Sequence, residues 1–168
     1  MKTLVLVFSL LFLALNSAQA ASAGDILINE VAWMGTLTSA NDEWIELYNN
    51  TENPINLDGW RLIAQDGTPK INLSGTIPAN GFYLLKRSKD YTGALNNKGE
   101  KLELYDNLGN LIDSVDASSG WPAGDNSIKQ TMERKDANVW PASNASRSDA
   151  GWQTSQNPGG TPKNKNSL

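Results

Sequence analysis

Short apolar runs separated by clusters of Asn, Gly, Asp and Pro constrain the fold of this chain more than any other feature. None of the runs is long enough, or periodic enough at 3.6 residues, to predict a helix, and several alternate between apolar and polar residues. The pattern predicts about eight short antiparallel strands, and therefore an all-β sandwich or barrel. The runs lie at residues 26–33, 43–49, 60–65, 70–75, 81–87, 100–106, 110–116 and 130–135.

The first twenty residues are typical of a secretory signal. Lys2 precedes an apolar run at residues 4–15, and the small residues of Ala18-Gln19-Ala20 follow it. Such a short run does not span a bilayer comfortably, so an uncleaved anchor is the less favoured alternative. We expect cleavage after Ala20, with Ala23 as a second option. The protein is then secreted or otherwise extracytoplasmic (periplasm or cell surface) and has no membrane span once the signal is removed.

The rest of the chain, residues 21–168, has the length of one domain. We assign residues 21–150 to the β-sandwich. The stretch Asn157-Pro158-Gly159-Gly160 excludes a helix near the end. We therefore expect residues 151–168 to form a C-terminal tail that closes on the domain or extends from it.

Composition excludes several classes of function. The chain has neither Cys nor His, so it cannot form disulfides, a Ser-His-Asp or Cys-His nucleophile, or an ordinary His/Cys zinc site. After removal of Lys2, 13 basic and 18 acidic residues leave a net charge of −5. An acidic chain without a basic run gives no electrostatic reason to bind nucleic acid. We expect no cofactor.

One short pattern occurs twice: "ELYNN" at residues 46–50 and "ELYDN" at residues 103–107. Each is interpreted as a strand that runs into a turn, because Asn and Asp favour turns and Gly109 suits a hairpin that needs a positive φ. Alternation then turns Leu47 and Leu104 towards the core. A ligand site used twice is the alternative.

The order of motifs resembles the lamin-tail domain family. The segment "EWIELYNNTENPINLDGWRL" (43–62) contains a strand ending Glu46-Leu47-Tyr48-Asn49, the apolar pair of Ile55-Asn56-Leu57, and Gly59-Trp60-Arg61-Leu62. Further similar segments follow in order, and the resemblance extends from residue 26 to about 166. They are "TIPANGFYLLKR" (76–87), "LNNKGEKLELYDNLGNLIDSV" (95–115), and the opening and closing stretches 28–36, 132–136 and 157–166.

This resemblance implies an immunoglobulin-like antiparallel β-sandwich of the type found in exported bacterial proteins. It implies a non-catalytic module, because the family has no catalytic residues that could be transferred to this chain. Trp60 then occupies a core position beside Leu57 and Leu62. The residues of the family's structural motif are Leu47, Asn49, Gly59, Trp60, Leu62, Leu102, Leu104 and Gly109.

The candidate binding residues are Trp44, Glu46 and Tyr48, which alternate with the core residues of one strand. If the N-terminal segment leaves this aromatic face uncovered, it is the best binding surface in the chain. We therefore expect an exported module that binds a protein or a surface polymer. A carbohydrate-binding module that uses exposed Trp and Tyr is the alternative, and a hydrolase based on two carboxylates is the remote one.

Two groups of acids and amides could in principle bind calcium, which takes six to eight oxygen ligands. Neither matches an Asp-x-Asp-x-Asp loop, so we interpret both as turns and solvated charges and expect no metal site. The first group is Glu30, Asp42, Glu43 and Glu46; the second is Asp106, Asn107, Asn110 and Asp113.

Overall fold

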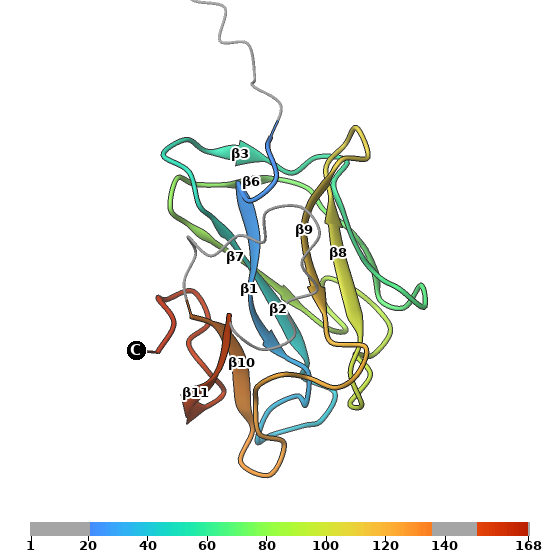
Figure 1. The fold of residues 1–168 in the computed structure, drawn as a ribbon, viewed down its shortest axis with the longest axis vertical. Coiled ribbons are helices and arrows are strands. Elements are labelled where there is room, and N and C mark those ends of the chain that lie inside the picture. The colour runs from blue at the N-terminus through green and yellow to red at the C-terminus, as the bar shows by residue number, and fades with distance from the viewer. Residues whose placement is uncertain (1–20, 136–150, 168) are drawn as a thin grey trace, which may run out of the picture.

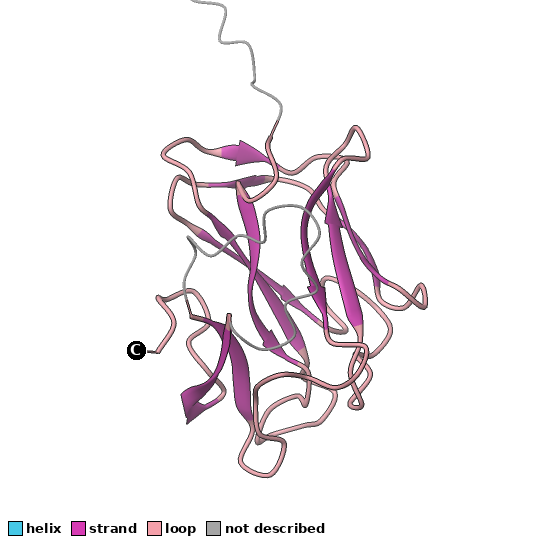
Figure 2. Cartoon of the chain, viewed as in Figure 1, coloured by secondary structure: helices cyan, strands magenta, loops and turns pink. Residues whose placement is uncertain are grey.

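The computed structural model describes residues 21–135 and 151–167, so the expected signal at residues 1–20 lies outside the described part. Within that part the chain is all-β, with strands and loops only (Figure 2). The strands are β1 (Ile26–Ala32), β2 (Trp44–Asn49), β3 (Ile55–Asn56), β4 (Arg61–Ala64), β5 (Lys70–Asn72), β6 (Thr76–Ile77), β7 (Phe82–Lys86), β8 (Lys101–Tyr105), β9 (Leu111–Asp116), β10 (Gln130–Arg134) and β11 (Trp152–Pro158).

The strands form two main sheets that face each other (Figure 1). One sheet has the order β11-β10-β1-β2-β7 and the other the order β5-β4-β8-β9, while β3 and β6 pair separately. Every strand pair is antiparallel. The predicted antiparallel β-sandwich is thereby confirmed.

All eight expected runs contain a strand, and the described residues contain three strands more. Strands β3 and β6 have two residues each, too few to show any alternation. Strand β11 is polar and buries only Trp152 and Ser155, so its sequence lacks an apolar face. It nevertheless pairs with β10, which places the first half of the expected tail within the sheet.

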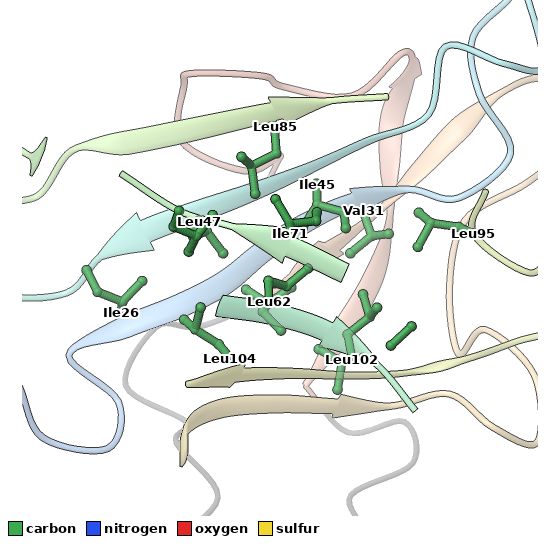
Figure 3. Packing of buried hydrophobic residues seen from close by; sticks show 14 of the residues in the cluster. Ile26, Val31, Ile45, Leu47, Leu62, Ile71, Leu85, Leu95, Leu102 and Leu104 are labelled. Carbon is green, nitrogen blue, oxygen red and sulfur yellow. The ribbon is translucent and has the colours of Figure 1, made fainter. Parts of the chain in front are cut away.

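The core lies between the two sheets and follows the predicted period of two. Ile45 and Leu47 of β2 point into it from one sheet, and Leu102 and Leu104 of β8 point into it from the other (Figure 3). Trp60 belongs to the same cluster and is 3% exposed. A large aromatic buried to this degree contributes strongly to the burial of apolar surface.

The side chain at the fourth position of each repeat accepts from the backbone amide two residues further on: Asn49 from Thr51 at 3.0 Å and Asp106 from Leu108 at 2.9 Å. The side-chain nitrogen of Asn49 donates to the carbonyls of Asn53 and Pro78 at 2.8 and 3.0 Å. The carboxylate of Asp106 accepts from the backbone amides of Leu108 and Asn110 at 2.9 and 2.7 Å. Both side chains thus satisfy backbone groups of a turn, which supports the interpretation of the repeat as structural.

Candidate functional site

The candidate site lies on the face of the five-stranded sheet that points away from the four-stranded sheet. This face is called the outer face. Trp44, Glu46 and Tyr48 of β2 lie on it, because their neighbours Ile45 and Leu47 point into the core. Their cross-strand partners on β7 are Lys86, Leu84 and Phe82, respectively.

Three glutamates form a row across the outer face, one on each of three adjacent strands. Glu30 of β1 pairs in register with Glu133 of β10 on one side and with Glu46 of β2 on the other. We call these three residues the acid row. All three are fully buried, which is unusual for a carboxylate without a cationic partner.

The acid row is buried because residues 159–167, here called the closing segment, return over it. After β11 the chain turns back on the side of the sheet away from β8 and β9 (Figure 1, red). Backbone amides of the closing segment donate to the row: Thr161 to Glu30 at 3.0 Å and Lys163 to Glu46 at 2.6 Å. Ser167 donates to Glu133 at 2.9 Å. The closing segment is therefore attached through polar contacts rather than through an apolar face.

The structure brings the three candidate binding residues onto one face but covers two of them. Trp44 is 5% exposed and Glu46 is fully buried. Tyr48 is half-buried, packs against Phe82 with ring centroids 5.1 Å apart, and donates to the side chain of Asn80 at 3.3 Å. Lys163 of the closing segment covers Glu46, and Gly159 and Pro162 of the same segment lie near Trp44.

A cleft of about 440 Å³ adjoins the closing segment at one end of β2 and β7. The side chains of Trp44 and Leu84 supply apolar surface, and Gly159 and Pro162 of the closing segment line it as well. The polar and charged lining residues are Thr36, Asp42, Glu43, Lys86, Arg87 and Lys89. The predicted Trp44 thus lies in a concave site, although little of its surface is open.

Positive charge is in excess at the rim of this cleft. Arg87 is paired with the buried Glu43 at 3.2 Å. Burial raises the pKa of Glu43, while the amide of Leu95 and the guanidinium of Arg87 oppose that rise. Lys86 and Lys89 are exposed and form no ion pair with another described residue. The other acids are Asp42, which lines the cleft, and Asp90, whose carboxylate accepts from the backbone amide of Lys86 at 2.8 Å. The three cations of the lining exceed its two acids by one formal charge.

Burial also controls the protonation of two carboxyls of the acid row, Glu30 and Glu46. It raises the pKa of Glu30 to about 7, against hydrogen bonds from Thr131 and Thr161. It raises the pKa of Glu46 to about 7 as well, against contacts with Lys163 and Asn29. Both carboxyls therefore change charge close to neutral pH.

The two groups considered for calcium separate in the structure. Glu30 and Glu46 belong to the acid row, whereas Glu43 binds Arg87 beside the cleft. Asp106 closes the β8–β9 hairpin, and Asp113 pairs with Arg134 at 2.8 Å. Within residues 21–135 and 151–167, no three acids stand together in an arrangement suited to a metal ion.

The tryptophans of the described part offer little open ring surface. Trp33, Trp44, Trp60 and Trp152 are all buried. Trp121 stacks on Trp33 with ring centroids 6.0 Å apart and donates to the carbonyl of Asn96. Trp140 lies outside the described residues. The four buried tryptophans therefore do not form the exposed aromatic surface that carbohydrate binding would need.

Fold and site together define an immunoglobulin-like β-sandwich of the binding type, with a cleft on one sheet face. The chain belongs to the Lamin Tail Domain family, which matches residues 19–119. This family is not a known family of enzymes. No curated protein matches the chain. In the described part of the chain, no helix is long and apolar enough to cross a membrane.

The protonation of Glu30 and Glu46 predicts a dependence of stability on pH. Their pKa values rise from 4.5 to about 7 on folding, so the folded state binds more protons between these values. The stability that these two groups contribute is fully present below about pH 4.5 and is lost as the pH rises through about 7. We expect a higher Tm at about pH 5 than at about pH 8.

Thermal unfolding of the wild type beside a Glu30→Gln, Glu46→Gln double variant checks this expectation. The double variant cannot ionise at either position, so its Tm should differ less between the two pH values. Burial also raises the pKa of Asp113 to about 6 and that of Glu100 to about 7, so both titrate in this window in the two proteins alike. The difference between the two proteins therefore reports Glu30 and Glu46. An equal pH dependence in both proteins would contradict the prediction.

Proposed function

We propose that the protein is an exported, non-catalytic binding module that holds an anionic protein segment or surface polymer in the cleft beside Trp44. The observation that carries the proposal is the combination of a concave site with Lys86 and Lys89 at its rim, which form no ion pair within residues 21–135 and 151–167. Opposite charge accelerates association and selects partners, even where it adds little to affinity.

The proposed site of action is outside the cytoplasm. The support is the sequence pattern of the first twenty residues, where a short apolar run ends in small residues. The absence of Cys is compatible with this location, because the core described above is continuous between the two sheets without disulfides. A protein partner is preferred over a sugar because the ring of Trp44 is covered across most of its surface.

Binding of a short poly-glutamate peptide, measured by calorimetry at low salt, tests the proposal. We expect binding by the wild type and at least about tenfold weaker binding by a Lys86→Glu, Lys89→Glu variant, since the rim charges are reversed. Lys70 and Lys98 are also exposed but do not line the cleft, so Lys70→Glu, Lys98→Glu is the matched control. This control changes the net charge equally and should leave binding within about twofold.

Three results would count against the proposal. Equal weakening by both charge reversals would show attraction to overall charge and not to the cleft. Binding of a neutral oligosaccharide in preference to poly-glutamate would favour the carbohydrate-binding alternative. Poly-glutamate binding that is insensitive to Lys86 and Lys89 would place the site elsewhere.

A further inference from the structure

One contact of the closing segment, at Thr161, requires a proton on a carboxyl group. The hydroxyl oxygen of Thr161 lies 3.0 Å from Glu30 Oε2 and 2.9 Å from Glu133 Oε1. A hydroxyl has a single proton and can donate to only one of them. The other contact requires a proton from a carboxyl group. The geometry alone therefore indicates that Glu30 and Glu133 do not both ionise while Thr161 lies between them.

The hydrogen bonds around Glu30 and Glu133 indicate that Glu30 carries this proton. Glu30 Oε1 accepts from the hydroxyl of Thr131 and from the amide of Thr161, which also lies 3.3 Å from Oε2. The Thr161 hydroxyl contacts Oε2, so Oε2 is the oxygen placed to donate to that hydroxyl. Glu133 accepts from the amide and from the hydroxyl of Ser167, at 2.9 and 3.1 Å. Burial and the neighbouring charge of Glu133 raise the pKa of Glu30, in agreement with this assignment.

Few charged side chains lie near the acid row among the described residues. Glu30, Glu46 and Glu133 supply the acids on β1, β2 and β10. Lys163 of the closing segment acts on Glu46 and favours its ionised form. Arg134 faces the opposite side of the sheet, where it is paired with Asp113. Ionisation of Glu30 and Glu46 would therefore add two negative charges under the segment, which carries Lys163 and Lys165.

We propose that residues 159–167 are a proton-dependent strap: the proton between Thr161 and the carboxyl groups of Glu30 and Glu133 holds it on the outer face, and its release uncovers that face. Gly159 and Pro162 of the strap also line the Trp44 cleft. Release of the strap therefore changes the cleft in which the anionic partner is proposed to bind, and this second half of the inference rests on the proposed function. Rising pH removes the proton from Glu30 and favours release.

Two adjacent glycines provide a matched pair of variants. A Cβ on Gly160 would lie 1.8 Å from Glu30 Oε1, whereas a Cβ on Gly159 would meet nothing within 4 Å. Both residues have a positive φ, 65° and 80°, so an alanine strains the backbone at either position. The difference between Gly160→Ala and Gly159→Ala thus isolates the contact with the acid row.

Limited trypsin digestion reports release directly, because Lys163 and Lys165 lie within the strap. A protease needs a locally opened chain. At one pH, we expect cleavage at these lysines to be at least about tenfold faster in Gly160→Ala than in Gly159→Ala. Near-UV circular dichroism should show that the sandwich remains folded in both. Equal cleavage rates, or cleavage spread over the whole chain in Gly160→Ala, would overturn the strap.

Amide hydrogen exchange in the unaltered protein tests the role of the proton. After correction for intrinsic exchange, the protection of the Thr161 and Lys163 amides should fall by at least about tenfold between about pH 5 and about pH 8. Glu30→Gln should abolish this fall. Its carbonyl can accept from Thr131 and Thr161, and its amide can donate to the Thr161 hydroxyl, as the protonated carboxyl does. Constant protection in the wild type would refute the proton dependence.

Poly-glutamate binding by the two glycine variants separates the strap from the proposed function. Altered affinity in Gly160→Ala alone supports coupling between the strap and the cleft. An open strap with unchanged poly-glutamate affinity would refute that coupling. If no protein binds poly-glutamate, the proposed function fails, while digestion and exchange still decide the strap.

Discussion

Replacing Trp60 by Ala is expected to cost about 3–5 kcal/mol of the free energy of unfolding, the range for removing a large aromatic side chain from a core. Trp60 is 3% exposed and packs within the cluster between the sheets. Its backbone amide donates to Leu57 at 2.9 Å and its carbonyl accepts from Leu73 at 2.9 Å. These backbone contacts remain in the variant, so the loss reports the indole ring itself.

Urea unfolding of Trp60→Ala beside Trp121→Ala measures this cost. Trp121 is only partly buried and lies at the edge of the core, against Trp33. Its replacement removes the same atoms but leaves a smaller cavity, so a smaller loss is expected. An unchanged midpoint in Trp60→Ala would contradict the core assignment.

The sequence predicted the sheets well because each central strand carries its own evidence. In β2 and β8, apolar residues at every second position define which face points into the core, independently of the rest of the chain. Strand β11 carries no such signal. Its pairing depends on β10, and one of its two buried residues is the small polar Ser155, which donates to the carbonyl of Asn157. A polar strand that forms only by pairing with a distant segment therefore cannot be predicted from apolar alternation.

The candidate site could be predicted only in part. Alternation placed Trp44, Glu46 and Tyr48 on one face, as the strand requires. Their cover comes from residues more than a hundred positions away, attached by backbone amides that any sequence possesses. Sequence pattern does not encode such contacts.

The basic rim was missed for a different reason. The only sign of it in the sequence is a cluster of three basic residues within residues 86–89, directly after the apolar residues 82–85. The three are Lys86, Arg87 and Lys89. The chain is acidic overall, and none of its basic runs is long enough to indicate nucleic-acid binding. A short cluster at the end of a strand matters only when the fold adds a concave surface beside it.

Replacing Arg134 by Leu is expected to destabilise the protein by about 3–5 kcal/mol, because it leaves the carboxylate of Asp113 buried without its cation. Asp113 is fully buried. It accepts from Arg134 at 2.8 Å and from the amide of Ile28 at 2.6 Å. Arg134 also donates to the carbonyl of Ile28 and lies 4.7 Å from the ring of Trp152. The pair thus joins β9 of one sheet to β1 and β10 of the other.

This loss should depend on pH and on Asp113. Burial raises the pKa of Asp113 to about 6, and Arg134 together with the amides of Ile28 and Ser114 opposes the rise. Without Arg134 the pKa of Asp113 should rise further, so the variant should lose additional stability as the pH increases from about 5 to about 8. Adding Asp113→Asn removes the unpaired charge and should recover part of the loss, which a double-mutant cycle in urea measures as a coupling energy. Additive losses from the two changes would show that the contact between the sheets does not depend on this ion pair, and the stabilisation would then come from the apolar core alone.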